Sequence, residues 1–363
     1  MHGEGAILRS LPALFESLGL DAIVASDQVS RAAALQRLDS LTKPLGALGD
    51  VEALAAQVCA VQRTLEPAII DPVALVFAAD HGIANRGVSA YPRAVTRQMV
   101  RNFLDGGAAI SVLARLHRID LWIVDAGVDG DCGSDPRLIP AKIGPGTRDF
   151  VEQPAMTSAE CHAAIERGRR AVDEVVAFPA NTLLLGEMGI GNTASAALLM
   201  HGLTATPLSA CVGRGTGLDD EGLKRKIAVL TAALARRSPP QDAVALLTEF
   251  GGYEIAMLVG AILGAAARRL LIVVDGFTVT VAAALAASID RNALEYCVFA
   301  HCSAEHGHRA LLQLLNSRPV LDLRMRLGEG SGAALALPVI RAAIDLYSNM
   351  ATFAGAGVSE KIV

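Results

Sequence analysis

The sequence predicts an α/β fold in which helices cover both faces of a parallel sheet. Short β-rich runs recur along the chain, and long stretches rich in alanine and leucine, typical of helices, separate them. An alternation of this kind is typical of βαβ units, whose strands are buried on both faces and are therefore continuously apolar. The predicted strands cover residues 73–80, 121–127, 182–187, 270–276, 296–301 and 319–325.

Charged or histidine side chains follow these predicted strands. Open parallel sheets bind their ligands at the carboxyl ends of the strands, so side chains placed there are candidates for a binding site. The pattern therefore predicts a ligand site along one edge of the sheet. The residues concerned are Asp80, His81, Asp125, Glu187, Asp275, His301 and, just past the last run, Glu329.

The two ends of the chain show no strand pattern. About the first 65 residues favour helices around the loop LTKPLGALGD, and the residues from Ala333 onward favour a helix again. We expect the two ends to pack together as a small helical lobe beside one dominant core. The predicted division is a large α/β domain at 66–332 and a small helical domain from 1–65 and 333–363.

Composition and charge favour small-molecule chemistry. Hydrophobic residues make up 52% of the chain and aromatic residues only 4%, which suits a sheet covered by helices. The net charge is -5, and the basic residues are scattered, so no stripe predicts binding to nucleic acid or to a membrane surface. No stretch reaches the roughly 18 to 20 consecutive apolar residues of a membrane span.

The cysteines predict a reducing compartment. The chain has six cysteines, far apart and without a C-x-x-C pair, and it begins without a basic-then-apolar leader. We therefore expect reduced thiols and a cytoplasmic protein.

Two glycine-rich turns resemble anion-binding loops. GEMGIGNTASAALLM at 186–200 and CVGRGTGLDDEGLKRKIAVL at 211–230 each place glycines just before a predicted helix. Such a turn presents free backbone N–H groups and the positive end of a helix to a phosphate. Either loop alone is equally well explained as a tight turn, but the pair favours a phosphate site.

The first loop also allows a different function. Gly189, Gly191 and Ala194 fit the dinucleotide pattern G-x-G-x-x-A, so an NADP-dependent oxidoreductase is an alternative. The acidic residue expected about 20 positions later for a ribose hydroxyl is missing, and that region offers only Arg214. A non-catalytic nucleotide-binding protein is the other alternative.

The segment AHCSAEHGH at 300–308 suggests a metal site but has unfavourable spacing. His301 and His306 are five residues apart, which on a helix separates them by about 140°, so they would not share a face. A polar loop that hydrogen-bonds a ligand or the backbone is the simpler interpretation. We therefore expect no metal and no other cofactor.

Glu329 is a carboxylate placed between two glycines and followed by an apolar helix, in MRLGEGSGAALALP at 325–338. It is either a turn residue that faces water or a group directed at a bound molecule. The local sequence alone does not decide between these.

Taken together, the motifs resemble the nicotinate-nucleotide:dimethylbenzimidazole phosphoribosyltransferase family. The matching segments run in order through nearly the whole chain. Asp50 stands where members often have a basic residue, in the helical lobe and away from the proposed chemistry. The segments are LTKPLGALG, ADHGIANRGVSAYPRAVTRQM, GTRDFVEQPAMT, GEMGIGNT, VGRGTGLDDEGLKRK, FGGYEIAMLVGA, VVDGF, HCSAEHGH and RLGEGSGAALALP.

The resemblance implies a doubly wound, mostly parallel sheet with a small helical domain from both termini, assembled as a homodimer. It implies transfer of 5-phosphoribose from nicotinate mononucleotide to a benzimidazole-type base in cobalamin synthesis, without a cofactor. Which base is preferred stays open. Glu329 then matches the general base, and a carboxylate sheltered between glycines could hold a raised pKa suited to accepting a ring proton.

The remaining site residues also follow from the resemblance. The nucleotide-binding positions are Glu187, Gly189, Gly191, Asn192, Thr193, Gly213, Arg214, Gly215, Thr216, Lys226, Asp275, Ser303 and Glu305. The base-binding positions are Asp80, Ser89, Tyr91, Gln98, Met99, Met188 and Leu327.

Overall fold

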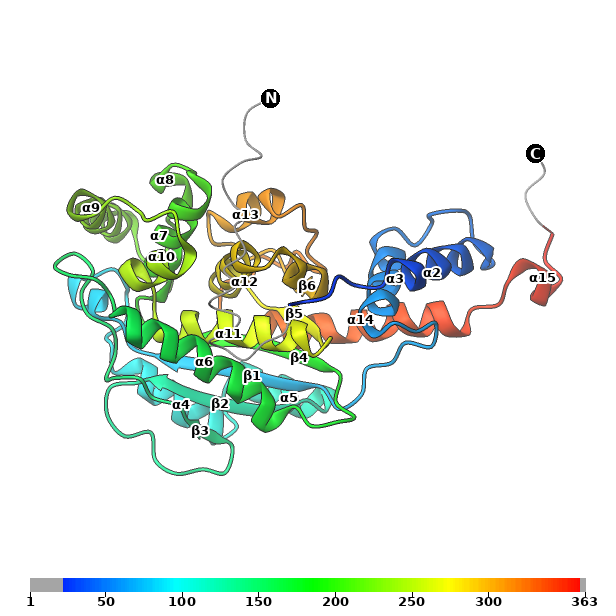
Figure 1. Cartoon of the computed structure of the whole chain (residues 1–363), viewed down its shortest axis with the longest axis horizontal. Helices are drawn as coiled ribbons and strands as arrows, with labels where there is room; N and C mark the ends of the chain where they lie inside the picture. The colour runs from blue at the N-terminus through cyan, green and yellow to red at the C-terminus, as the bar shows by residue number, and fades with distance from the viewer. Residues whose placement is uncertain (1–21, 360–363) are drawn as a thin grey trace.

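The computed structural model describes residues 22–359 and contains a six-stranded sheet in which every strand pair is parallel. The strand order is β3-β2-β1-β4-β5-β6, so the chain winds outward from β1 in both directions (Figure 1). This confirms the predicted α/β class. The strands are β1 (Val73–Ala79), β2 (Asp120–Gly127), β3 (Leu138–Pro140), β4 (Thr182–Met188), β5 (Leu271–Val274) and β6 (Cys297–Phe299).

Three strands of the sheet are buried on both faces. All residues of β1, β5 and β6 are buried, which explains why their sequences are apolar without alternation. One face of the sheet packs against a layer of α6 (Ser158–Val175), α11 (Tyr253–Ala267) and α12 (Phe277–Ile289). The other face packs against α4 (Val95–Leu104), α5 (Ala109–His117) and α14 (Ser331–Asn349).

The sequence-based strand predictions differ from the structure at two places. The strand expected at 319–325 is wrong: only an isolated parallel bridge between His301 and Leu321 forms, and Arg324 has a φ of 57° that interrupts extended backbone. Strand β3 was not predicted, because three residues ending in a proline are too short to show a periodic pattern.

Helices from both ends of the described chain lie side by side. The helices α2 (Gln28–Ser40) and α3 (Asp50–Gln62) pack on each other, and α3 also packs on α14. Arg37 of α2 donates to the Tyr347 carbonyl of α14 at 3.0 Å and lies over the Tyr347 ring. The short helix α15 (Phe353–Ala356) follows α14. The parts of the predicted small domain at 1–21 and 360–363 lie outside the described residues, and the domain boundaries stay a prediction.

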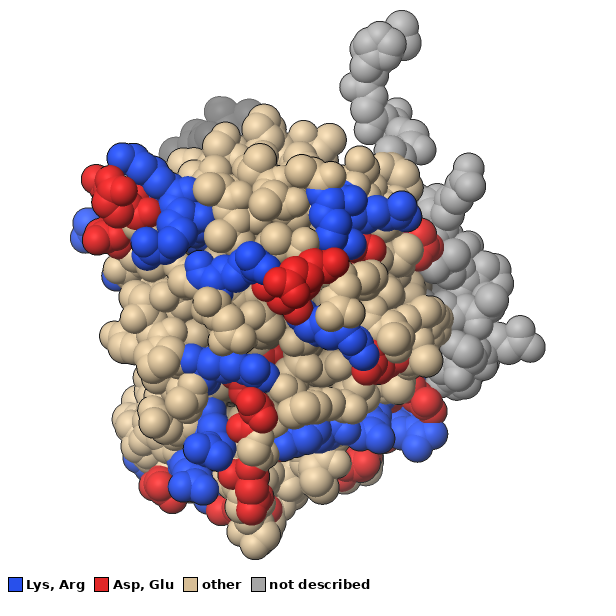
Figure 2. Space-filling model, turned by 90° about the vertical axis from the view of Figure 1, so that its left-hand side faces the viewer, with Lys and Arg blue, Asp and Glu red and all other residues tan. Residues whose placement is uncertain are grey.

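A second group of helices gathers at the other end of the molecule (Figure 1). It contains α7 (Asn192–Thr204), α8 (Leu208–Cys211), α9 (Asp220–Arg236) and α10 (Ala243–Phe250). The remaining elements are the 3-10 helices η1 (Gly82–Arg86) and η2 (Arg291–Tyr296) and the helix α13 (His308–Leu314). Among the residues that the structure describes, none of the helices could cross a membrane. Basic and acidic side chains are interspersed on the face shown in Figure 2, without a patch of one sign.

Candidate active site

A cleft of about 80 Å³ lies at the carboxyl ends of β4, β5 and β6. This is the edge at which the sequence predicted a ligand site. Its walls come from segments far apart in the chain, which the parallel topology brings together. They are Glu187–Ile190 with Asn192 and Thr193, Gly215 and Thr216, Gly276–Thr278, His301 with Ser303 and Glu305, and Arg326–Gly328.

The first glycine-rich loop lies directly on the sheet. A Cβ atom at Gly189 would lie 2.6 Å from the Ala79 carbonyl oxygen of β1, so only glycine allows this close approach. Gly191 has a φ of 100° and precedes the first residue of α7, whose amino end therefore lies at the cleft. The Asn192 and Ala194 N–H groups donate to loop carbonyls, whereas the Thr193 N–H has no partner among the described backbone hydrogen bonds. The loop has the geometry of an anion site.

A buried histidine–carboxylate contact supports this loop from below. His81 Nε2 lies 2.6 Å from the Glu254 carboxylate, and His81 Nδ1 lies 3.2 Å from Ser195 Oγ on α7. All three side chains are inaccessible to solvent. A carboxylate in the protein interior needs a hydrogen-bond partner, so Glu254 holds the His81 ring in place. Gly189 lies against that ring, so the contact also fixes the position of Gly189.

Lys226 joins the two glycine-rich loops. It is inaccessible to solvent, and its Nζ donates to Thr193 Oγ1 at 2.9 Å and to the Gly213 carbonyl at 3.2 Å. Burial lowers the pKa of Lys226 to about 8, against the opposing effect of the Glu305 carboxylate. The ammonium thus places positive charge behind both loops.

Glu329 occupies a strained turn on strand β4. Its φ is 67°, and Gly328 and Gly330 on either side both have a φ of 84°. A non-glycine residue in this region costs about 1–3 kcal/mol, so the surrounding contacts have to hold it there. The Glu329 N–H donates to the Glu187 carbonyl at 3.2 Å, and a Cβ at Gly186 would lie 2.5 Å from the Gly330 nitrogen. The turn therefore rests directly on the strand.

Asp275 holds this turn from the neighbouring strand. The carboxylate accepts from the Gly330 N–H at 3.1 Å and from the Ala333 N–H at 3.0 Å, satisfying donors at the start of α14. Burial raises the pKa of Asp275, while His301, whose Nε2 lies 3.7 Å from it, acts in the opposite direction. Asp275 thus holds the backbone that carries Glu329.

Two carboxyl groups beside the cleft have strongly raised pKa values. Burial, with a smaller contribution from Asp275, raises the pKa of Glu329 to about 7. Burial, with contributions from Asp275, Glu254 and Glu329, raises the pKa of Glu187 to about 8, although Asn192 donates to its carboxylate. Glu329 is 5% exposed, and its Oε2 has no hydrogen-bond partner among the described residues. A carboxylate in this state is suited to accept a proton from a bound molecule near neutral pH.

The buried His308 makes hydrogen bonds within the protein. His308 Nδ1 accepts from the Ser303 N–H at 2.8 Å, so its Nε2 carries the proton toward Thr280 Oγ1, also at 2.8 Å. Burial lowers the pKa of His308 to about 3, which keeps the ring neutral. Within residues 22–359, no group of three histidine, cysteine, aspartate or glutamate side chains is arranged to hold a metal ion.

Comparison with known proteins identifies the family. Residues 23–358 match a family model described as phosphoribosyltransferase. The chain is 53% identical over 322 residues to the nicotinate-nucleotide-dimethylbenzimidazole phosphoribosyltransferase of Cupriavidus taiwanensis, covering 89% of this chain and 93% of that protein. It is 46% identical over 332 residues to the protein of the same name from Vibrio cholerae, covering 89% and 96%. The chain belongs to this phosphoribosyltransferase family.

A solved structure supports the same assignment. The crystal structure of the nicotinate-nucleotide-dimethylbenzimidazole phosphoribosyltransferase from Thermus thermophilus superposes with a TM-score of 0.87 at 42% identity, covering 92% of this chain and all of that one. The resemblance predicted from the motifs is confirmed, and the protein is a pentosyltransferase. The oxidoreductase alternative is not favoured.

The structure brings most predicted nucleotide residues of this phosphoribosyltransferase together. Among them, Glu187, Gly189, Asn192, Thr193, Gly215, Thr216, Ser303 and Glu305 line the cleft. The others are Gly191, Gly213, Arg214, Lys226 and Asp275. Of these, Gly191, Gly213, Lys226 and Asp275 lie behind the lining, as described above, whereas Arg214 turns toward Asp220 and the Leu218 carbonyl.

The predicted base residues are more dispersed. Only Met188 and Leu327 line the cleft. Ser89 Oγ contacts Thr216 Oγ1 at 2.9 Å, which places the segment 89–99 next to the second loop, but Tyr91 is 55% exposed and Gln98 is also exposed. Met99 packs partly against the core. Asp80 is buried and accepts from the Asp129 N–H at 2.8 Å, so it organises the loop after β2 rather than the cleft wall.

The sequence interpretation missed several cleft residues. His301 was noted at a strand end but was not assigned to the site, and Arg326 was not considered although it lies within the quoted motif RLGEGSGA. Gly276 and Phe277, the last two residues of the motif VVDGF, and Thr278, which follows it, also line the cleft. These cleft residues could have been predicted from the sequence because they lie within or next to the recognised motifs.

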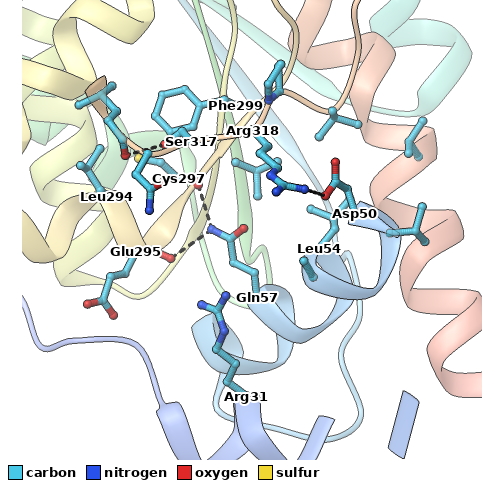
Figure 3. Close-up of a pocket in the computed structure, with 18 of the residues that line it drawn as sticks. Arg31, Asp50, Leu54, Gln57, Leu294, Glu295, Cys297, Phe299, Ser317 and Arg318 are labelled. Carbon is cyan, nitrogen blue, oxygen red and sulfur yellow. Dashed lines mark hydrogen bonds and ion pairs between the residues drawn. The ribbon is translucent and has the colours of Figure 1, made fainter. Parts of the chain in front are cut away.

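A larger hollow of about 680 Å³ lies elsewhere, between α3 and the edge formed by η2 and β6 (Figure 3). Gln57 Nε2 donates to the Cys297 carbonyl at 2.9 Å and to the Glu295 carbonyl at 3.3 Å. Arg318 pairs with Asp50 at 2.6 Å across its rim. These polar groups are satisfied within the protein, and none of the residues assigned above to catalysis or binding lines this hollow.

Proposed function

We propose that the protein transfers 5-phosphoribose from nicotinate mononucleotide to 5,6-dimethylbenzimidazole or a related base. The products are α-ribazole 5′-phosphate and nicotinate, in nucleotide-loop assembly of cobalamin. The observation that carries the proposal is the buried Glu329 carboxylate, with one oxygen unpartnered among the described residues, beside a cleft framed by two glycine-rich loops.

In this reaction the bond between C1′ of the ribose and the nicotinate nitrogen breaks, and its electron pair stays on that nitrogen. The pyridinium therefore leaves as a neutral ring, and no acid is needed on the leaving side. One nitrogen of the benzimidazole attacks C1′ from the opposite face and inverts the anomeric centre. The other ring nitrogen loses its proton to Glu329, whose pKa of about 7 suits this transfer.

Glu187 would have a complementary role. Its pKa of about 8 keeps it mostly protonated at neutral pH, so it can donate a hydrogen bond but is a poor proton acceptor. When their environments give two carboxyl groups different pKa values, one group can accept a proton while the other donates a hydrogen bond. One Glu187 oxygen accepts from Asn192, so the other oxygen, when protonated, would face the cleft as a donor.

The two loops would bind the 5′-phosphate. Backbone N–H groups at the start of α7 and in the turn at 213–216 supply donors, and Lys226 supplies charge behind them. The segment around Tyr91 and Met99, with Met188 and Leu327, would form the wall of the base pocket.

The location and assembly are also proposals. All six cysteines are buried and unpaired, which supports a reducing compartment such as the cytoplasm. The family resemblance supports a homodimer. Light scattering of the purified protein tests the assembly, and a monomer at enzymatic concentrations would contradict it.

The test of function is turnover by the purified protein. Nicotinate mononucleotide and a panel of benzimidazoles, purines and phenols are supplied, and nicotinate release and the riboside phosphate are measured. Stoichiometric formation of nicotinate and an α-riboside phosphate is expected. Tight nucleotide binding without product for any base would instead support the non-catalytic nucleotide-binding alternative.

A further inference from the structure

Arg326 is the one residue lining the cleft whose side chain is cationic at every physiological pH, within the part of the chain that the structure describes. The other ionisable lining residues are Glu187, Glu305 and His301. Arg326 is exposed, and it lies three residues before Glu329 on the same turn. A permanent cation therefore borders the proposed reaction centre.

The backbone around Arg326 is anchored on both sides. The Met325 carbonyl accepts from the Ala304 N–H at 2.8 Å, and the Glu329 N–H donates to the Glu187 carbonyl at 3.2 Å. The guanidinium reaches across to the second loop, where Nη1 donates to the Gly215 carbonyl at 3.2 Å. The side chain thus extends across the cleft from a segment of backbone that is held in place.

Most donors of this guanidinium are free. A guanidinium has five N–H donors, and among the described residues the bond to Gly215 is its one hydrogen bond, with no carboxylate paired to it. By contrast, Arg214 on the second loop pairs with Asp220. An unpaired arginine beside a ligand cleft is suited to bind an anionic group of the ligand.

The donor nucleotide has two anionic groups, the 5′-phosphate and the carboxylate of the pyridine ring. Backbone N–H groups and Lys226 already serve the phosphate in the proposed arrangement. The pyridine ring is bonded to C1′, so its carboxylate lies near the reacting carbon. In the proposed reaction this ring leaves from the face of C1′ opposite the base that Glu329 deprotonates, and the Arg326 guanidinium lies across the cleft from Glu329, at the second loop. The planar edge of a guanidinium matches a carboxylate through two parallel hydrogen bonds.

We propose that Arg326 binds the carboxylate of the nicotinate ring and makes the enzyme selective for nicotinate over nicotinamide nucleotides. The proposal rests on the proposed function and names the recognition of its donor. It also has a consequence for the leaving step. As the C1′–N bond breaks, the ring nitrogen loses its positive charge and the leaving group becomes an anion, which a guanidinium at the carboxylate stabilises.

The test compares nicotinate mononucleotide with nicotinamide mononucleotide in the wild type and in Arg326→Met. The two nucleotides share the phosphate and the ribose and differ only in carboxylate against amide. In the variant, kcat/KM for the nicotinate nucleotide should fall by about 10- to 100-fold, the range of a hydrogen bond to a charged group, while the value for the nicotinamide nucleotide stays within about twofold. Arg326→Lys, which keeps a point charge without the planar fork, should lie between.

Arg324→Met is the matched control, because Arg324 is an exposed arginine on the same segment that does not line the cleft. It should leave the preference unchanged. Equal losses for both nucleotides in Arg326→Met would show that Arg326 serves the shared phosphate or the loop, and would overturn the proposal. An unchanged preference would overturn it as well.

Calorimetric binding of both nucleotides, without any base, separates this proposal from the proposed function. If the wild type binds the nicotinate nucleotide more tightly and Arg326→Met loses that difference, Arg326 has the role proposed here even if no base is turned over. If both forms bind the two nucleotides equally, the selectivity proposal fails while phosphoribosyl transfer can still be observed. Thermal unfolding of the variants checks that each is folded.

Discussion

The cleft at the strand ends and the hollow beside β6 differ in a way that their volumes do not reveal. The hollow beside β6 is the larger, about 680 Å³ against about 80 Å³ for the cleft at the strand ends (Figure 3). Gln57 and Arg318 there pair with backbone and with Asp50, and among the described residues no buried side-chain nitrogen or oxygen of its lining lacks a hydrogen-bond partner. In the cleft region, by contrast, buried oxygens of Glu305 and Glu329 lack partners among the described residues. Because unpaired buried polar groups cost free energy, they mark the place where a ligand completes the structure.

Replacing Glu329 should have the largest effect in this comparison. Glu329→Gln keeps the shape but cannot accept a proton, so kcat should fall by about 10²- to 10⁴-fold while nucleotide binding changes little. The wild-type rate should also decrease as the pH falls below about 7, because Glu329 becomes protonated there. If the variant kept near-normal turnover and lost rate at low pH in the same way as the wild type, Glu329 would be excluded as the base. Glu187 would then be the next carboxylate to test.

A change in the first glycine-rich loop should act mainly on the binding of the nucleotide. Gly189→Val places atoms against the Ala79 carbonyl and the His81 ring, displacing the loop by the order of 1 Å. The KM for nicotinate mononucleotide should rise by about 10²-fold, with a much smaller change for the base. Gly133→Asn is the control, because Gly133 has open space around it and asparagine tolerates its φ of 83° better than other residues do. Equal losses for both substrates would indicate misfolding instead of lost phosphate binding.

The unpaired carboxylates should also limit stability. An acid whose pKa is raised on folding loses stability as the pH rises from its unfolded pKa, here 4.5, to its folded pKa, here about 7 for Glu329. Glu329→Gln removes this cost, so its melting temperature should exceed that of the wild type by about 2–4 °C at pH 8 and by less at pH 5. Scanning calorimetry at both pH values measures the difference. A variant less stable than the wild type at pH 8 would mean that the carboxylate is paired in solution.

A substitution at the rim of the larger hollow should have the smallest effect on stability and turnover. Arg318 and Asp50 are 81% and 65% exposed, so Arg318→Ala should change the free energy of unfolding by no more than about 1 kcal/mol. Turnover with both substrates should stay unchanged. Loss of activity in Arg318→Ala would show that this hollow contributes to the reaction and would remove the contrast between the two sites.

The sequence was sufficient for the parts of the fold that depend on local pattern. Continuous apolar runs predicted β1, β2, β4, β5 and β6, and the residues just after those runs predicted the edge where the cleft lies. The run at 319–325 alternates apolar and charged residues from Leu321 onward, and a positive φ at Arg324 limits it to one bridge. Hydrophobicity alone carries no information on that dihedral angle.

The details of the site depend on tertiary contacts that no spacing rule contains. The position of Arg326 across from Gly215 joins residues 111 positions apart, and Asp275 reaches Gly330 over 55 positions. Asp80 has the same place at a strand end as Glu187, yet the loop after β2 folds over it and buries it. Strand-end position therefore predicted the neighbourhood of the site, but the loops decided which side chains enter the cleft.

The turn that carries Glu329 lies against Gly186, in the middle layer of the protein, and this affects how the enzyme can move and fail. A base mounted on a mobile lid can be lost by local opening long before the protein melts. Here the base cannot leave its place unless β4 separates from α14. Substrate entry must therefore depend on outer segments such as the one around the exposed Tyr91. On heating, catalysis should persist up to the temperature at which the sheet itself unfolds.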